Sequence, residues 1–358
     1  MRSRERPTKR LGESVKQRGA AADRFGIEAY DAAGVGLVAA FAGWTVVSAA
    51  VRGGNPIPQL VLLVTATAAY ALGRLQGRDH VARVATVIVL VIIAMTLASG
   101  PGAFAGGPLD PPLGYGNANG ALYALGVAAA AVIARASKRA SIRWVGAVLV
   151  VLLLIFTVVT TSKAATVLAG GIVLVALGAH RLGRWVLVVA PAFVFAAVAV
   201  TVVVGVTRGL VEPPGVEGVL TERRADLWHE ALEITAHAPA FGVGPGGFAD
   251  TSPTALSDPD ARWAHSAYLQ AAAETGIPGT LLLGAVTLWT FGSLYRSQQD
   301  LRLVVIGAAA ASALTLHAAI DYVMHFPALV VLTALLVGMA SSRSLLTPDA
   351  HDAQDCAP

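Results

Sequence analysis

Long apolar runs alternate with polar gaps along almost the whole chain. Ten runs can be drawn, each close to the length that a bilayer-spanning helix needs, with ends uncertain by about two to four residues. They lie at roughly residues 28–51, 57–75, 81–99, 119–136, 142–160, 164–179, 185–206, 275–295, 303–321 and 326–342. The pattern predicts an all-α polytopic membrane protein with about ten transmembrane helices.

One gap, residues 207–274, is far longer than an ordinary connection. It contains several aromatic residues, so we interpret it as a folded, partly helical loop rather than a linker. Residues 221–236 are predicted to form a helix with Thr221 as N-cap, ended by Pro239. The predicted organisation is a basic tail (1–27), transmembrane helices 1–7 (28–206), a loop carrying the site (207–274), helices 8–10 (275–343) and a second tail (344–358).

Composition and charge support this interpretation. Of the 358 residues 55% are apolar or aromatic and 13% are charged, whereas soluble domains carry roughly 25% charged residues. By the positive-inside rule, 20 of the 26 Lys and Arg residues fall in alternate gaps together with the N-terminal tail. This predicts a multi-pass protein of the cytoplasmic (inner) membrane with both termini cytoplasmic. The basic residues form no clustered face, so nucleic-acid binding is not expected.

Six basic residues remain on the predicted outer side, against the topology rule. Among them Lys163 lies in a very short turn between two spans, and Arg223 and Arg224 lie in the long loop. Fixed cations at the outer membrane surface suit a pyrophosphate, which needs charge-assisted donors. The alternatives are a snorkelling lysine at the interface and solvated surface arginines.

Two familiar signatures in the loop carry little weight. Residues 242–247 fit G-x-G-x-x-G, but a dinucleotide site needs a preceding strand and a later acidic residue, so we interpret the glycines as a tight turn. Asp258-Pro259-Asp260 resembles a metal-binding D-x-D pair of soluble glycosyltransferases. Nucleotide-sugars are cytoplasmic, so a solvated acidic turn is the simpler interpretation. No metal site and no cofactor are predicted.

Histidines mark the return of the chain to the membrane. A neutral His265 can accept a proton from a hydroxyl near neutral pH; the alternative is a histidine that only hydrogen-bonds at the interface. His317, Asp321 and His325 share one face if their helix continues that far. This spacing suits zinc, but a helix end before Pro327 would separate His325, which favours a polar network supporting the site.

Six segments with recognisable motifs lie between about residues 110 and 340. They are Gly114 to Gly120, with a Y-x-N pattern; Thr160 to Lys163; Glu222 to Leu232, an arginine-to-tryptophan helix; Pro239 to Phe248, a P-x-x-G-x-G-x-x-x-F turn; Ala264 to Gly279, similar to H-N-x-Y-L-Q and E-x-G-x-x-G; and His317 to Tyr322, similar to H-x-x-x-D-F. In this order they resemble the O-antigen ligase and O-antigen polymerase (Wzy-like) membrane glycosyltransferases, whose Y-x-N and T-x-S-R places the first two segments occupy. No single segment is specific.

The resemblance implies an outward-facing cavity roofed by the loop. It also implies transfer of a glycan from undecaprenyl pyrophosphate to a hydroxyl on a glycan, lipid or protein acceptor, by inversion and without a metal. The implied catalytic residues are His265, Arg224 and Lys163. The residues we expect to bind substrate are Arg223, Trp228, Asn117, Tyr268, Asp321 and His317. Two positions depart from the family pattern: Lys163 lacks the forked donors of an arginine, and Ser266 stands where an asparagine is usual.

Other classes of function stay open at this point. A transporter or flippase of lipid-linked saccharides would need polar residues along the spans, and these spans hold few. A non-catalytic scaffold of a polysaccharide assembly complex would tolerate replacement of His265 and the outer cations. Within the transferase interpretation, the sequence does not separate ligase from polymerase.

Overall fold

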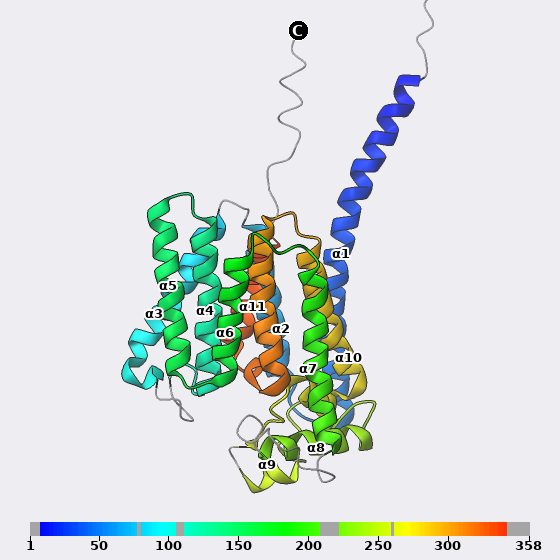
Figure 1. The fold of residues 1–358 in the computed structure, drawn as a ribbon. Coiled ribbons are helices and arrows are strands. Elements are labelled where there is room, and N and C mark those ends of the chain that lie inside the picture. Colours follow the sequence, from blue (N-terminus) through cyan, green and yellow to red (C-terminus); the bar gives the residue numbers. More distant parts are fainter. Residues whose placement is uncertain (1–7, 77–79, 105–110, 208–221, 259–260, 342–358) are drawn as a thin grey trace, which may run out of the picture.

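The computed structural model describes residues 8–76, 80–104, 111–207, 222–258 and 261–341. The regular elements of this part are helices, and most run side by side in one bundle (Figure 1). In chain order they are α1 (Thr8–Arg52), α2 (Ile57–Leu75), α3 (Val81–Ser99), η2 (Gly100–Phe104), α4 (Gly116–Ala136), α5 (Ala140–Val159), α6 (Lys163–Gly178), α7 (Val186–Thr207), α8 (Glu222–His237), α9 (Pro253–Ser257), α10 (Ala267–Tyr295), α11 (Leu301–Ile320), η4 (Val323–His325) and α12 (Pro327–Ala340).

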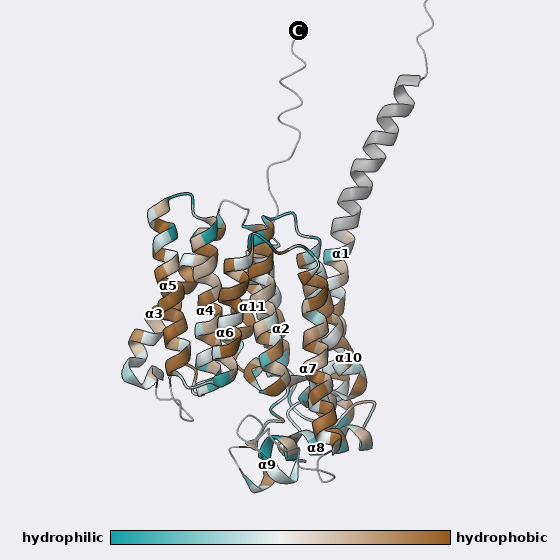
Figure 2. Cartoon of the chain, in the orientation of Figure 1, coloured by the Kyte–Doolittle hydropathy of each residue, from teal (hydrophilic) through white to brown (hydrophobic). Residues whose placement is uncertain are grey.

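Eight of the described helices are long and apolar enough to cross a membrane, and α6 and α12 are shorter apolar helices. Together they occupy the places of the ten predicted runs. Large apolar side chains on α3, α5 and α7 stay exposed in the isolated chain, and Figure 2 colours much of α5 and α7 brown, as hydrophobic. Such surfaces are stable against lipid rather than water. The prediction of an all-α, multi-pass membrane protein is confirmed.

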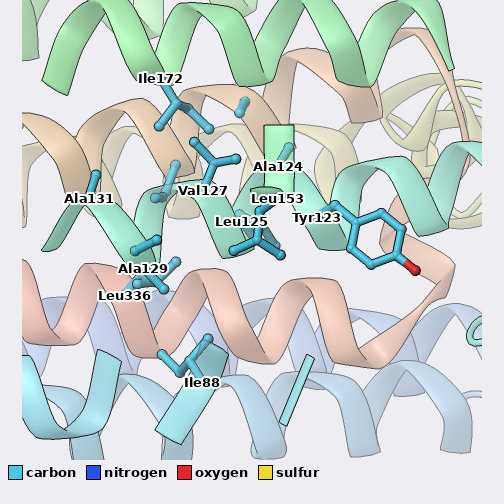
Figure 3. Packing of buried hydrophobic residues seen from close by; sticks show 14 of the residues in the cluster. Ile88, Tyr123, Ala124, Leu125, Val127, Ala129, Ala131, Leu153, Ile172 and Leu336 are labelled. Atoms are coloured by element: carbon cyan, nitrogen blue, oxygen red, sulfur yellow. The ribbon is translucent and has the colours of Figure 1, made fainter. Parts of the chain in front are cut away.

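Helix α4 lies at the centre of the bundle and is buried on nearly all sides. Its alanines allow α3, α5, α6 and α11 to approach closely, which is how small residues pack membrane helices. Figure 3 shows Tyr123, Leu125 and Val127 of α4 beside Leu153 of α5 and Ile172 of α6. This packing fixes the end of α4 that carries Tyr115 and Asn117.

Two helix boundaries differ from the sequence prediction. Helix α1 begins at Thr8, so residues expected as a tail continue the first span as helix; Lys, Arg, Glu and Ala are all good helix formers. Helix α10 begins at Ala267, inside the predicted loop, because Ser266 caps it. The predicted start of the eighth span coincides instead with a break in α10 at Gly276, where φ is 71° and ψ is −176°.

Beyond the end of the bundle at which α7 leaves it, the long loop folds into a small layer containing α8 and α9 (Figure 1). It has its own apolar core, in which Leu227, Trp228 and Phe248 are fully buried. Residues 222–237 form the helix predicted for residues 221–236. Its predicted N-cap, Thr221, lies outside the described residues.

The glycine turn of the loop docks onto the break in α10. Pro278 has no N–H, so the carbonyl of Glu274 lacks its helical donor and accepts instead from Gly244 N (2.9 Å) and Ser48 Oγ (3.1 Å). Val243 N donates to the Ala273 carbonyl (2.9 Å) in the same way. The turn is therefore held by carbonyls that the helix leaves unsatisfied.

This docking needs glycine at the closest approach. A Cβ on Gly276 would lie 2.4 Å from the Ala240 carbonyl oxygen, and one on Gly242 would lie 2.5 Å from that of Ala273. Both glycines have positive φ, a conformation that residues with a Cβ rarely adopt. The loop is thereby fixed to the helix that follows it.

Candidate active site

The carboxylate of Asp321 is the meeting point of three distant segments. Helix α11 ends at Ile320, and Asp321 itself is extended and 1% exposed. Its Oδ2 accepts hydrogen bonds from Asn117 Nδ2 (2.7 Å) and Tyr115 Oη (3.0 Å), both near the start of α4. Arg224 Nη2 on α8 lies 2.9 Å from the same oxygen.

Arg224 is placed by the packing of α8 onto the bundle. One turn further along, Trp228 is fully buried in the loop core, and its Nε1 donates to the carbonyl of His265 (3.2 Å). The side chain of Arg224 is 19% exposed, so it reaches the buried carboxylate of Asp321 while part of its surface stays accessible. Trp228 thus links α8, which carries Arg224, to the segment that carries His265.

His265 lies directly before α10, in the left-handed region with φ of 50°. Its Nδ1 is 3.5 Å from Asp321 Oδ1, longer than a normal hydrogen bond. Nδ1 has no hydrogen-bond partner among the described residues. The next residue, Ser266, is the N-cap of α10 and accepts from Leu269 N (3.4 Å). Serine and asparagine are both favoured N-caps, which accounts for serine at this place.

The surroundings of Asp321 favour its charged form. Burial alone would raise the pKa of Asp321, but the nearby His265, together with Arg224 and His317, lowers it from 3.8 to about 2. The pKa of the Tyr115 hydroxyl is raised, first by burial and then by the charge of Asp321. At neutral pH the centre therefore holds a carboxylate that accepts from a neutral phenol.

His317 lies one helical turn before Asp321 and is 1% exposed. Its Nε2 has no hydrogen-bond partner among the described residues. It lines a small cavity between α4, α6 and α11, together with small residues such as Ala121, Ala124, Ala165 and Ala313. His325 does not continue this helical face, because α11 ends at Ile320. Within the described ranges, no group of three His, Cys, Asp or Glu residues is arranged to hold a metal ion.

The predicted cations occupy different surroundings. Lys163 is exposed and is the first residue of α6, after the N-cap Ser162. Its turn packs against α4, since a Cβ on Gly120 would lie 2.9 Å from Thr160 Oγ1 and 3.0 Å from Ser162 Cβ. Lys163 therefore lies at the same end of the bundle as Asn117. Arg223, whose side chain is 50% exposed, forms an ion pair with Asp258.

Two expected substrate-binding residues, Trp228 and Tyr268, are enclosed by protein. Tyr268 is 2% exposed, and its hydroxyl lies 3.4 Å from Thr287 Oγ1 of the same helix. Trp228 packs in the core of the loop, and Tyr268 packs within α10. Arg224, His265, Asn117 and Asp321 are thus gathered at one centre, whereas Arg223, Trp228 and Tyr268 face other partners.

Tyr115 and Tyr322 were not among the predicted site residues. The ring of Tyr322 lies edge-on to that of His265, with centroids 4.8 Å apart, and stacks on Tyr115 at 4.6 Å. Both tyrosines belong to segments of the family resemblance, the Y-x-N place and the residue after Asp321. Those motifs were the only features of the sequence that could have pointed to these two tyrosines.

Residues 148–284 match the O-antigen ligase family. The match covers less than half of the chain and supports an O-antigen ligase-like assignment. The match contains Lys163, Arg224 and His265 and ends before Asp321. No curated protein matches the chain. The family match supports a glycan-transfer role in polysaccharide assembly, with a lipid-linked donor and an acceptor.

Proposed function

We propose that the chain transfers a glycan from undecaprenyl pyrophosphate to an acceptor hydroxyl on the outer face of the cytoplasmic membrane, as a ligase or as a polymerase. The observation that carries this proposal is the convergence of Arg224 and His265, both from the long loop, on Asp321 at the end of α11 in an O-antigen ligase-like chain. The site combines a cation for the leaving group with a base for the nucleophile.

Arg224 stabilises the departing pyrophosphate. A guanidinium carries five N–H donors, and the ion pair with Asp321 is made through Nη2, so donors remain for phosphate oxygens. Lys163 adds a second charge at the N-terminus of α6, where the helix dipole also favours an anion. These fixed charges act electrostatically, and the proposed reaction does not require a metal.

His265 acts as the base. Its Nδ1 faces the carboxylate of Asp321, an arrangement that orients the ring and stabilises the imidazolium, and Nε2 takes the proton of the acceptor hydroxyl. The acceptor oxygen forms a bond to the anomeric carbon of the donor sugar. The bond from that carbon to the pyrophosphate breaks on the opposite side. The products are undecaprenyl pyrophosphate and an inverted glycosidic bond.

The decisive experiment presents the donor and an acceptor on one face of proteoliposomes containing the full chain. We expect a new glycosidic bond, which His265→Ala and Arg224→Ala each abolish while the protein stays folded. Lys138→Ala, an exposed cation between α4 and α5, serves as the control. Full turnover by both site variants would contradict the proposal. Movement of the donor across the bilayer without a new bond would indicate a flippase instead.

Deleting the gene separates the two forms of the reaction. A surface glycan shortened to one repeat unit indicates a polymerase. Full-length chains retained on the lipid carrier indicate a ligase. Unchanged glycan output when the site residues are replaced together would indicate a scaffold.

A further inference from the structure

Four aromatic rings lie in near-parallel contact beside the carboxylate of Asp321. The ring centroids of Tyr115 and Tyr322 are 4.6 Å apart with an angle of 22° between the planes. Tyr115 and Phe326 are 5.9 Å apart at 11°, and Trp263 and Tyr322 are 6.3 Å apart at 26°. The rings come from the start of α4, the loop and the connection between α11 and α12.

These rings are not closed off as a core. All four are only partly buried. His325, an exposed residue, has its ring centroid 3.9 Å from that of Trp263. The loop has a core elsewhere, where Trp228 and Phe248 are fully buried. If the four rings served only to fasten the loop, burying them as fully as Trp228 and Phe248 would stabilise the fold more. The cluster therefore presents aromatic surface at the edge of the site.

The aromatic cluster lies next to His265, the proposed base. Tyr322 meets His265 edge to face at 4.8 Å, and Trp263 precedes His265 by two residues in the same segment. Tyr115 belongs to the cluster through its ring and to the charged centre through its hydroxyl, which donates to Asp321. A molecule resting on the rings is thus bordered by the imidazoles of His265 and His325.

We propose that Tyr115, Trp263, Tyr322 and Phe326 form a stacking subsite for a pyranose ring of the acceptor saccharide. This inference rests on the proposed function and specifies the acceptor class of the same site. A pyranose presents C–H groups on its faces, and these suit the electron-rich face of an aromatic ring. Its hydroxyls need polar neighbours at the rim, which His265 and His325 supply. A polyprenyl chain needs an apolar surface alone, so it fits this location less well.

Binding without donor tests the subsite directly. Saturation-transfer NMR is recorded on the full chain in nanodiscs with methyl pyranosides of glucose, galactose, mannose, rhamnose and N-acetylglucosamine, and with sorbitol as an acyclic control. We expect transfer to the ring C–H protons of at least one pyranoside and none to sorbitol. Trp263→Ala should weaken its binding about tenfold, the effect of a lost stacking contact, and Trp263→Phe should retain it. Trp185→Ala, an exposed indole near the start of α7, is the matched control.

The outcomes separate this inference from the proposed function. In transfer assays we expect Trp263→Ala to raise the KM of the acceptor about tenfold, with the donor KM unchanged. Transfer without pyranoside binding, equal binding in Trp263→Ala and Trp185→Ala, or a rise in the donor KM alone would each overturn the subsite and leave the transferase proposal standing. Pyranoside binding that depends on Trp263 in a chain that forms no glycosidic bond would support the subsite and contradict the transferase.

Discussion

Arg224 and Asp321, 97 positions apart in the sequence, form an ion pair of 2.9 Å at the end of the helix bundle. The pair links the helix of the long loop to the residue that ends α11. Asn117 donates to the same carboxylate oxygen from 204 positions away. Asp321 is therefore the element that ties the loop, α4 and α11 into one site.

Asp321→Asn is expected to remove most transfer activity. The amide keeps the shape of the side chain but neither pairs with Arg224 nor stabilises a charged His265. We expect kcat in the reconstituted assay to fall at least about 100-fold, the usual scale of a general-base contribution. Asp258→Asn, which changes the loop partner of Arg223, is the matched control and should stay within about threefold. Near-normal kcat in Asp321→Asn would exclude the carboxylate from catalysis.

The depressed pKa of Asp321 predicts a specific dependence of stability on pH. The folded-state pKa of about 2 lies below the unfolded value of 3.8, so the ionised carboxylate stabilises the fold above pH 3.8. This contribution, about 2 kcal/mol, is lost as the pH falls through 2. The difference in Tm between wild type and Asp321→Asn should be constant from pH 5 to 8 and should shrink below pH 4. A difference that grows with acidification would contradict the assigned charge.

The spans could be predicted from the sequence, because most apolar runs have the length that a bilayer requires and the basic residues alternate between gaps. The break in α10 was not predicted, since it depends on Gly276 approaching Ala240, a contact made only after the loop has folded back. The start of α10 at Ala267 follows from the serine cap that was interpreted as part of the loop.

The site was predictable only as far as local motifs reach. The motifs pointed to Arg224, His265 and Asp321 separately, and helical spacing joined Asp321 to His317 and His325. Periodicity contains no information on contacts between residues about 100 or 200 positions apart, so the central place of Asp321 could not be read from it. For the same reason the separate partners of Arg223 and Arg224 appeared only in the structure.

Gly276→Ala is expected to loosen the loop from α10. The added Cβ would lie 2.4 Å from the Ala240 carbonyl oxygen at a φ of +71°, and a strained conformation of this kind alone costs about 1–3 kcal/mol. We expect a lower Tm and faster proteolysis between residues 239 and 266. Gly170→Ala in α6, where a Cβ meets nothing within 4 Å, should leave Tm unchanged or raise it. Equal Tm values for the two variants would contradict the docking described here.

The contribution of Lys163 to activity should depend on its positive charge. Lys163→Arg is expected to retain activity, because the cation remains at the N-terminus of α6. Lys163→Ala should lose most of it, about tenfold or more in kcat/KM for the donor, the scale of one charge-assisted contact. Arg52→Ala, another exposed cation predicted on the outer side, controls for a general loss of positive charge. If all three Lys163 forms turn over equally, the lysine is a bystander.

Arg223 and Arg224 are expected to behave differently although they are neighbours. Successive side chains of a helix point about 100° apart, so Arg223 pairs with Asp258 while Arg224 reaches Asp321. An exposed ion pair contributes at most about 1 kcal/mol, so Arg223→Ala should shift stability by less than that and change kcat/KM less than about threefold. Arg224→Ala should lower kcat/KM at least about 100-fold, because it removes the charge that stabilises the leaving pyrophosphate. If Arg223→Ala proves as damaging as Arg224→Ala, both arginines hold the donor, as the sequence alone predicted.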